Sequence, residues 1–397
     1  MTGVILSDNI RSRSFAHFDL SRVPSPCFVV DKVAIENNLK ILQRVQQQSG
    51  ARVLLALKAF SMFSLAPLIG RYLQGTCASG LNEARLGREE FGGEVHTFCA
   101  AYSEPDLKEI LKISDHLVFN SFSQWQRFQP LLQEARKARP GLQFGLRVNP
   151  QHSEGATPLY DPCAPCSRLG IVREQFEGQN LEGISGLHFH TLCEQDFPPL
   201  QRTLAAVEQQ FGHLLPQLKW LNLGGGHHIT RADYQVDALI GCLQALTEKY
   251  NLQLYLEPGE AIAINSGILV TEVLDITQNQ IPLAILDCSA TCHMPDTLEM
   301  PYRAEVFGAG TAGEKTHTYR FGGQSCLAGD QMGDYSFDQP LQIGQRLAFD
   351  DMAHYTMVKT NTFNGVNLPA LALWNSATDQ LRIIKQFGYQ DFKQRLS

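Results

Sequence analysis

Two residues that could do chemistry follow apolar runs of the kind that form buried strands. Lys58 ends the run at 51–57, and Glu257 follows the run at 252–256. In folds built on parallel strands, reactive groups collect at the carboxyl ends of the strands. A lysine amine in an enclosed site is a candidate Schiff-base nucleophile, because desolvation lowers its pKa and frees the lone pair. A lone lysine at such a position is more often a surface residue just past a strand. The residues at the other strand ends must therefore show whether Lys58 is reactive.

Other polar or glycine residues also fall at predicted strand ends. They are Ser79, Arg147, His188, His190 and the triple glycine Gly224, Gly225 and Gly226. Bare backbone N–H groups in such a loop can approach a phosphate closely, although a flexible turn explains three glycines equally well. A lysine, a phosphate-binding loop and a carboxylate on neighbouring strands form the set of groups that pyridoxal 5'-phosphate needs. The lysine forms the imine, the loop holds the phosphate, and the carboxylate keeps the pyridine nitrogen protonated.

The elements that would position these residues alternate between strand and helix over residues 31–265. We expect strands near residues 52–57, 76–78, 95–99, 117–121, 143–149, 184–190, 219–223 and 252–256. We expect helices at residues 64–74, 80–91, 104–112, 123–138, 197–214 and 232–250. Strands and helices in this number and order are typical of an α/β fold, the (β/α)8 TIM barrel. A doubly wound open sheet is the alternative, because a strand count from sequence is uncertain by about one or two.

The pattern changes after about residue 265. Short β-like runs then dominate, at residues 267–276, 282–288, 316–321, 346–349 and 371–374, and glycine and proline punctuate them. This pattern predicts a mainly-β domain over residues 266–397. We expect the N-terminal segment, residues 1–30, to join that domain through a strand that ends at Asp31. Asp31 would then cap the first helix of the barrel domain.

The composition narrows the class of protein and its partners. The 397 residues are 44% hydrophobic and 18% charged, and the net charge is -7. This charge argues against nucleic acid and anionic membranes as partners, and no run approaches the roughly 18 apolar residues of a membrane span. The first nine residues lack the pattern of a secretory signal. The ten cysteines are too few for a disulfide framework, so we expect reduced thiols in a cytoplasmic protein.

Motifs spread along the chain occur in an order that resembles a known family. They are Ala56-Leu57-Lys58-Ala59, Gly186-Leu187-His188-Phe189-His190, Leu223-Gly224-Gly225-Gly226, Glu257-Pro258-Gly259, Gly323-Gln324-Ser325-Cys326, and Tyr355-Thr356 with Thr362-Phe363-Asn364-Gly365. With them the chain resembles the fold-type III pyridoxal-phosphate enzymes, in the family of ornithine, arginine and diaminopimelate decarboxylases. Within this family it is similar to the decarboxylases of carboxynorspermidine and carboxyspermidine. The resemblance implies an alanine-racemase-like barrel with a β domain, pyridoxal 5'-phosphate as cofactor, and decarboxylation of a polyamine precursor.

The resemblance also implies which residues are catalytic. Lys58 resembles the imine lysine, His190 the histidine that stacks on the cofactor ring, and Glu257 the acid that faces the pyridine nitrogen. Cys326 resembles the cysteine that protonates the substrate carbon after carbon dioxide leaves. In the family this cysteine reaches the active site from the neighbouring subunit, which implies a homodimer with shared active sites. His188 receives no role.

Further cofactor contacts follow from the same resemblance. The triple glycine and Tyr355 resemble the residues that hold the phosphate, and Ser79 is expected near the cofactor. Arg147 could orient an acid near the ring or simply brace the barrel, and the sequence leaves both possibilities open.

Two departures from the family bear on the substrate. Glu260 stands where many relatives carry an arginine that touches the phosphate, and Leu327 stands where diamine decarboxylases carry the aspartate that meets the distal amine. Both argue against ornithine. A longer, multiply aminated substrate suits extra carboxylates, since ammonium groups form charge-assisted hydrogen bonds with them. The candidates for substrate binding, each of which could equally be a solvated loop acid, are Glu260, Asp296, Glu299 and Asp330.

Two further features leave alternatives open. Diaminopimelate or another basic amino acid is the alternative substrate, and Arg303 could bind a distal carboxylate, although the sequence around it is not a clean match. Cys163 and Cys166 have the spacing of half a zinc site, but no second Cys-x-x-Cys follows them. We therefore expect no metal, and interpret these thiols as part of a loop near the substrate entrance.

Overall fold

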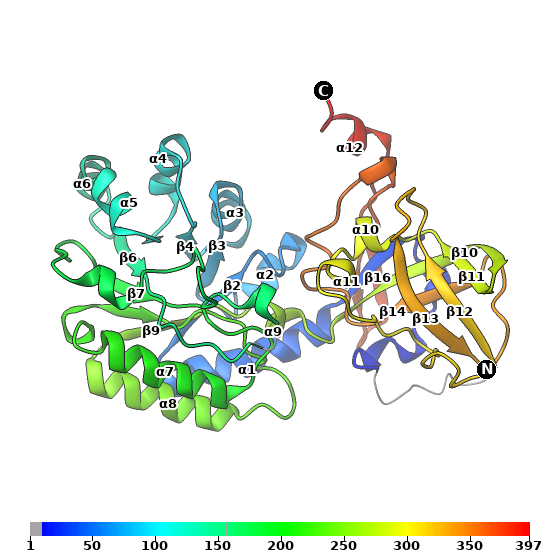
Figure 1. Ribbon diagram of the computed structural model, residues 1–397, viewed down its shortest axis with the longest axis horizontal. Coiled ribbons are helices and arrows are strands. Elements are labelled where there is room, and N and C mark those ends of the chain that lie inside the picture. Colours follow the sequence, from blue (N-terminus) through cyan, green and yellow to red (C-terminus); the bar gives the residue numbers. More distant parts are fainter. Residues whose placement is uncertain (1–9, 156) are drawn as a thin grey trace. The chain divides into compact units, whose positions relative to one another are not determined.

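The computed structural model describes residues 10–155 and 157–397, so residues 1–9 of the predicted N-terminal segment lie outside the described part. The chain forms two compact units, one made of residues up to 36 together with 263–397, the other of residues 37–262 (Figure 1). The first is mainly β, and the second alternates strands and helices. Each is described by itself.

Residues 37–262 build a closed barrel of parallel strands. The strands follow one another in chain order, and pairing of the first with the last closes the barrel. They are β2 (Arg52–Ala56), β3 (Gly75–Ala78), β4 (Glu94–Phe98), β5 (His116–Phe119), β6 (Gln143–Arg147), β7 (Gly186–His188), β8 (Trp220–Asn222) and β9 (Gln253–Leu256). The predicted TIM barrel is confirmed, and the open sheet is excluded.

Helices precede, connect and follow the barrel strands. They are α1 (Lys32–Ser49), which enters from the first unit, α2 (Ala66–Ile69), α3 (Leu81–Leu86), α4 (Glu104–Ile113), α5 (Phe122–Arg127), α6 (Gln129–Ala138), α7 (Phe197–Phe211), α8 (Val236–Tyr250) and α9 (Glu260–Ala263). Helical spacing of apolar residues explains them: Leu39, Leu42 and Val45 form a fully buried face of α1. The predicted helix at 64–74 is wrong for much of its length, because α2 ends at Ile69 and turns lead from Gly70 to β3.

The other unit holds a sheet in the order β13-β12-β11-β10-β1-β15-β16, with β14 paired to β10. The strands are β1 (Cys27–Asp31), β10 (Gly267–Asn279), β11 (Ile281–Leu286), β12 (His317–Gly322), β13 (Gln331–Phe337), β14 (Arg346–Phe349), β15 (Ala370–Asn375) and β16 (Gln380–Lys385), and the short helices are α10 (Ala290–His293), α11 (Asp296–Glu299) and α12 (Tyr389–Lys393). β1 lies between β10 and β15, which makes this N-terminal strand central to the sheet. Val29, Val270 and Trp374 belong to the apolar cluster that packs around it.

In the described part of the chain, no helix is both long and apolar enough to cross a membrane.

Candidate active site

A pocket in the barrel unit gathers side chains from the carboxyl ends of several strands. It is lined by Ala56, Lys58, Cys77, Ala78, Ser79, His96, Thr97, Phe98, Val118, Arg147, His188, His190 and Glu257. Every strand-end residue that the sequence singled out, apart from the glycine loop, is therefore part of one pocket. This convergence follows from the barrel, since all parallel strands end at the same rim.

The carboxylate of Glu257 is held from two sides. Asn222 Nδ2 donates a hydrogen bond of 2.7 Å to Oε1, and His188 Nε2 lies 3.3 Å from Oε2. Burial by itself raises the pKa of Glu257, but the imidazole of His188 and the amide of Asn222 outweigh burial and lower the pKa to about 2. Glu257 is thus an ionised carboxylate at neutral pH. Such a group can hold a proton on a nitrogen base that enters the pocket.

The glycine loop after β8 fixes the ring of His190. The Gly225 N–H donates a 3.0 Å hydrogen bond to His190 Nδ1, and the Gly224 N–H donates a 2.9 Å bond to Asn222 Oδ1. Burial lowers the pKa of His190 well below its usual value, so the ring is neutral and can accept at Nδ1. A Cβ at Gly225 would overlap the backbone oxygen of Glu257, which is why this position needs glycine. Two amide donors of the loop are used within the protein, and the contact of the loop with a phosphate stays a prediction.

Arg147 braces the pocket from β6. Its Nη2 donates a 3.0 Å hydrogen bond to the backbone oxygen of His190, and its guanidinium lies 4.6 Å from the centre of the Phe98 ring. Burial lowers the pKa of Arg147 to about 10, so the group stays charged at neutral pH. These contacts support the bracing role, one of the two that the sequence leaves open.

Lys58 and Ser79 are the exposed members of the pocket. Lys58 lies in the turn directly after β2, between the buried residues Leu57 and Ala59, so the backbone is fixed while the amine remains open to a ligand. The Ser79 N–H donates a 2.6 Å hydrogen bond to Glu83 in the first turns of α3.

Several pocket residues are not singled out by the sequence analysis. Cys77, His96 and Phe98 line the pocket from β3 and β4. Strand alternation turns them inward, but the linear sequence cannot distinguish them from core residues until the barrel is closed. Asn222 had a usable signal, because it is a polar residue that ends an apolar strand just before the glycine loop.

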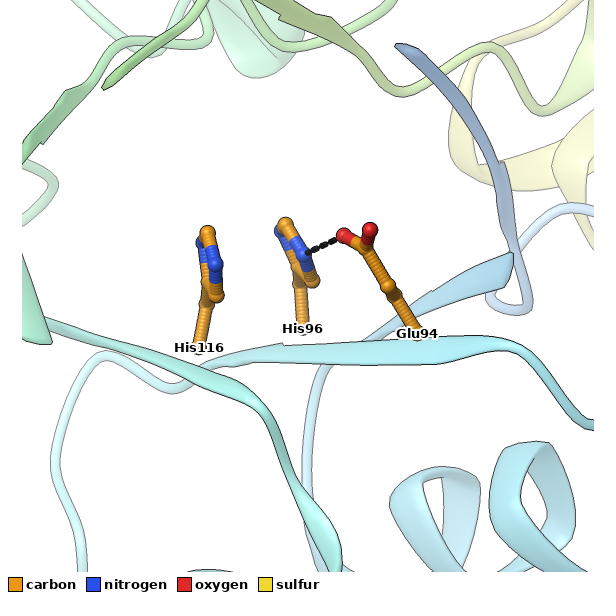
Figure 2. Close-up of side chains that lie close together, drawn as sticks. All are labelled: Glu94, His96 and His116. Carbon is orange, nitrogen blue, oxygen red and sulfur yellow. Dashed lines mark hydrogen bonds and ion pairs between the residues drawn. The ribbon is translucent and has the colours of Figure 1, made fainter. Parts of the chain in front are cut away.

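A second polar cluster lies inside the barrel and includes His96. Among the described residues, Glu94, His96 and His116 form the one group of three or more side chains whose possible metal-ligating atoms all lie within 4.8 Å of one another (Figure 2). The rings of His96 and His116 are stacked, with 3.9 Å between their centres and 18° between their planes. Their nitrogen lone pairs therefore run side by side instead of converging on one point.

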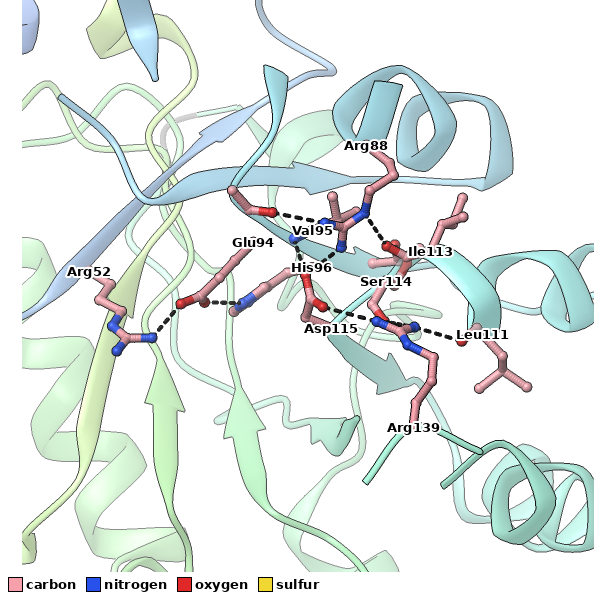
Figure 3. A network of polar contacts seen from close by, with 12 residues as sticks. Arg52, Arg88, Glu94, Val95, His96, Leu111, Ile113, Ser114, Asp115 and Arg139 are labelled. Carbon is pink, nitrogen blue, oxygen red and sulfur yellow. Dashed lines mark hydrogen bonds and ion pairs between the residues drawn. The ribbon is translucent and has the colours of Figure 1, made fainter. Parts of the chain in front are cut away.

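The neighbours of this cluster also oppose a metal ion. Arg52 hydrogen-bonds one oxygen of Glu94, and His96 Nε2 lies 3.0 Å from the other oxygen (Figure 3). A cation placed beside the Arg52 guanidinium would be repelled. Figure 3 also shows Asp115 held between Arg88 and Arg139. The geometry supports an internal network of hydrogen bonds and ion pairs.

The protein is expected to lose stability in mild acid because His116 can be protonated in the unfolded chain but not in the folded one. Burial lowers the pKa of His116 to about 2, whereas an unfolded histidine titrates near 6.5. Below that pH the unfolded chain binds a proton that the folded chain does not, so the free energy of unfolding falls by up to about 1.4 kcal/mol per pH unit. Denaturant unfolding between about pH 7 and 5 should show a flatter dependence for His116→Gln. The exposed-site variant His213→Gln should keep the wild-type slope, and an unchanged slope in His116→Gln would contradict this account.

The remaining predicted catalytic and phosphate residues belong to the β unit. Cys326 is exposed in the loop between β12 and β13, and Tyr355 follows β14 in a left-handed backbone conformation with φ of 45°. Asp330 is buried and accepts hydrogen bonds from Ser289 and Ser325. Its role in substrate binding stays a prediction that this placement does not support.

The other acids proposed for substrate binding have basic neighbours. Glu260 Oε1 lies 3.1 Å from His228 Nε2 in the barrel unit. The carboxylate therefore points toward this imidazole, at the position where the sequence analysis expects an arginine in many relatives. In the β unit, Lys359 forms ion pairs with Asp296 and Glu299. Contacts of these acids with substrate amines stay predictions.

Arg303 and the Cys-x-x-Cys pair have different surroundings from those that their alternative roles require. Arg303 donates hydrogen bonds to Glu305 and to the backbone oxygens of Gly310 and Asp334. Cys163 is half-buried, Cys166 is exposed, and both are free thiols. In the described ranges no third metal-ligating side chain lies close enough to join them in a site.

Comparison with known proteins assigns the family. The family model described as "Pyridoxal-dependent decarboxylase, C-terminal sheet domain" matches residues 27–353. The chain belongs to the pyridoxal-dependent decarboxylases. This decarboxylase is 45% identical to carboxyaminopropylagmatine decarboxylase of Synechocystis, over 95% of this chain and 96% of the relative. It is 40% identical to carboxynorspermidine/carboxyspermidine decarboxylase of Campylobacter jejuni, over 94% of this chain and 99% of the relative.

Solved structures agree with this assignment. Carboxynorspermidine decarboxylase from Campylobacter jejuni, complexed with norspermidine, has a TM-score of 0.87 to this decarboxylase at 40% identity, over 94% of this chain and 100% of that chain. Diaminopimelate decarboxylase from Helicobacter pylori, complexed with L-lysine, has a TM-score of 0.78 at 17% identity, over 95% and 97% of the two chains, and shares the fold.

The cofactor of this family is pyridoxal 5'-phosphate, and the barrel pocket fits it by the chemistry of its donors. An open lysine amine, a neutral imidazole and an ionised carboxylate line the same pocket. These groups can hold an aldehyde, pack against an aromatic ring and bind a pyridine proton.

Proposed function

We propose that this decarboxylase removes the α-carboxylate of carboxynorspermidine and carboxyspermidine and releases norspermidine and spermidine in polyamine biosynthesis. Two curated relatives of that name are 40% and 38% identical over 94% of this chain. The observation that carries the proposed chemistry is the meeting of Lys58, His190 and Glu257 in one pocket.

The residues of the pocket divide the work. Pyridoxal 5'-phosphate, when bound, supplies an aldehyde that condenses with amines and a ring that accepts electrons. Lys58 would hold that aldehyde carbon through Nζ until the α-amine of the substrate takes its place. Glu257, ionised and fixed by Asn222 and His188, would hold the proton on the pyridine nitrogen. His190, fixed by the Gly225 N–H, would pack on the ring.

Glu257 and His190 are positioned together, because residues that hydrogen-bond to them belong to one segment, the end of β8 and the loop after it. Asn222 donates to Glu257 through Nδ2 and accepts from Gly224 through Oδ1, while Gly225 donates to His190. The loop after β8 thus sets the carboxylate and the imidazole together. Preorganised groups of this kind need no rearrangement at the moment of reaction, which is the largest advantage that a protein site has over water.

Proton delivery to the α-carbon is assigned to Cys326. The thiol is exposed on its own unit, and the apolar side chains of Leu327 and Phe363 near it are each 45% exposed. We infer that these exposed apolar side chains belong to a larger surface that meets a partner. The proposed partner is a second copy of the chain, so that each active site takes Lys58 from one subunit and Cys326 from the other.

Mixed dimers test the shared site. Lys58→Ala and Cys326→Ala are each expected to be nearly inactive, because each lacks one half of every site. If subunits exchange freely after mixing equal amounts, half of the dimers are mixed and contain one intact site, which restores about a quarter of the wild-type activity. Size-exclusion chromatography checks that both variants are dimers. No recovery from dimers shown to exchange would contradict the shared site.

A second candidate substrate is carboxyaminopropylagmatine. The Synechocystis relative that is 45% identical carries that name. Agmatine ends in a guanidinium, whereas the proposed substrates end in a primary ammonium, and the two groups differ in shape and hydrogen-bond geometry. Both substrates present the same α-amino acid end to the pocket, so the distal end decides between them.

A substrate panel on one preparation separates the candidates. The panel is carboxynorspermidine, carboxyspermidine, carboxyaminopropylagmatine, diaminopimelate and ornithine, and the measurement is carbon dioxide release. We expect kcat/KM for a carboxylated polyamine to exceed that for diaminopimelate by at least about 100-fold, because an unmet carboxylate or amine is costly to bury. Turnover of diaminopimelate alone would overturn the substrate assignment. Preference for carboxyaminopropylagmatine would favour the second candidate.

A further inference from the structure

The loop that carries Cys326 is held at two points. It connects β12 with β13 and contains the motif Gly323-Gln324-Ser325-Cys326, followed by Asp330. One attachment comes from the buried carboxylate of Asp330 at the end of the loop. The other comes from Asn364, which lies far along the chain. The thiol itself is exposed.

Asp330 ties the loop to the start of α10. Its Oδ2 accepts hydrogen bonds from Ser289 Oγ at 2.8 Å and from the Ser325 N–H at 3.1 Å, and its Oδ1 accepts from the Thr291 N–H at 3.2 Å. The residue is 4% exposed. A Cβ at Gly323 would lie 2.5 Å from Asp330 Oδ2, so the glycine of the motif makes room for the carboxylate. Three donors and this close packing leave Asp330 as an internal support.

Asn364 holds Cys326 directly. Its Oδ1 accepts a 2.7 Å hydrogen bond from the Cys326 N–H. Asn364 has φ of 57°, a left-handed conformation that asparagine tolerates better than most residues. The backbone around the thiol is therefore fixed by an amide oxygen from a separate segment.

Both attachments lead to the same helix. Asn361, three residues before Asn364, donates from Nδ2 to the Thr291 oxygen at 2.8 Å and from its N–H to the Cys292 oxygen at 2.9 Å. Ser289, Thr291 and Cys292 thus join the segment of Asn364 to the carboxylate of Asp330. Because α10 is buried at Ala290, Cys292 and His293, it provides a rigid base for both.

We propose that Asp330 and Asn364 are positioning residues that aim the thiol of Cys326 at the α-carbon of the substrate, and that Asp330 does not bind a substrate amine. This inference rests on the proposed role of Cys326. In that role, loss of carbon dioxide leaves an electron pair at the α-carbon. The thiol proton moves to that carbon, a C–H bond forms as the S–H bond breaks, and solvent returns a proton to the thiolate.

The test follows the destination of that proton. Turnover in D2O by the wild-type enzyme should place deuterium on one face of the α-carbon, because the donor is fixed. Asp330→Asn, whose amide nitrogen cannot accept, and Asn364→Gly, which keeps the backbone conformation but removes the acceptor, should both give deuterium on both faces. Both should lower kcat by about 10- to 100-fold, the effect of misplacing a catalytic group by roughly 1 Å. KM should change less than about two-fold, since no substrate contact is lost.

Matched variants distinguish a loss of thiol positioning from a general loss of structure. Asn364→Asp retains an acceptor oxygen and should keep the wild-type stereochemistry. Asp334→Asn removes a carboxylate that pairs with Arg320 on the neighbouring strands and should leave kcat and stereochemistry unchanged. If Asp330→Asn does not fold, the pair Asn364→Gly and Asn364→Asp carries the test. A higher KM in Asp330→Asn with full stereospecificity would overturn the proposal and favour substrate binding.

Cys326→Ser distinguishes failure of the inference from failure of the proposed mechanism. Wild-type kcat and stereospecificity in Cys326→Ser would show that Cys326 is not the donor, and both ideas would fall. A slow, non-stereospecific Cys326→Ser together with an unaffected Asn364→Gly would overturn only the positioning role.

Discussion

Replacing Lys58 by alanine is expected to lower kcat by on the order of 10⁴-fold or more, as when other covalent nucleophiles are removed. The expected loss is large because no other lining residue can replace the amine. The pocket contains other polar side chains, but Lys58 is the only amine among the residues that line it in the described structure. Steady-state carbon dioxide release measures the loss. Sodium borohydride treatment should link the cofactor covalently to the wild-type peptide that contains residue 58 and not to the variant.

The matched control for Lys58→Ala is Lys249→Ala. Lys249 is an exposed surface lysine paired with Glu208, so its loss should leave turnover within about two-fold of wild type. Wild-type turnover in Lys58→Ala would show that this lysine has no covalent role, although it lies in the pocket.

Replacing Glu257 by glutamine is expected to lower kcat by about 10²- to 10⁴-fold, the range typical of lost proton control by a positioned side chain. Glutamine keeps the size of the side chain and an oxygen for Asn222, but it has no charge to hold a proton on the cofactor nitrogen. The pKa of Glu257 is about 2, so no fall in kcat from this residue should occur near the usual glutamate value of about 4.3. The measurement is kcat as a function of pH for both proteins.

Stability gives a second measure of the same residue. The folded pKa of Glu257 lies below the unfolded value, so its ionised form stabilises the fold above about pH 4.3, and that stabilisation is lost as pH falls toward 2. Glu257→Gln should show a flatter loss of stability across this window. Glu154→Gln, which removes an acid paired with Arg202 at the surface, should retain normal turnover. A Glu257→Gln enzyme with normal kcat would refute the proton-holding role.

The barrel strands could be predicted closely because their sequences carry a strong signal. The run at 51–57 is apolar and bounded by polar residues, and the strand there spans Arg52–Ala56. The predicted helix at 64–74 is wrong beyond Ile69, where α2 ends and turns lead to β3. β13 was missed, because Gly333 and Asp334 interrupt the alternation of apolar residues in Gln331–Phe337. Its pairing with β12 compensates for the weak local preference.

Some residues of the candidate site could likewise be predicted from the sequence, and others could not. Lys58, His190 and Glu257 were predictable because polar residues at the ends of apolar strands are conspicuous in the sequence. Asn222 and His96 become visible only when strands pair, since their importance depends on which residue lies across the barrel. The surroundings of Asp330 could not be predicted either: an acid four residues after Cys326 suggested a ligand for the substrate, and the structure shows that Ser289, Thr291 and Ser325 donate hydrogen bonds to it.

The packing of the glycine loop limits how this enzyme could be re-engineered. Any side chain at Gly225 would strike the Glu257 backbone, and one at Gly226 would strike the Leu192 backbone. We expect libraries that vary these positions to consist mostly of misfolded proteins. Variation aimed at a new substrate is better directed at exposed positions such as Leu327, where the described chain leaves room for another side chain and formation of the proposed dimer is the remaining constraint. The glycine loop therefore tolerates substitution far less well than the exposed loop that carries the thiol.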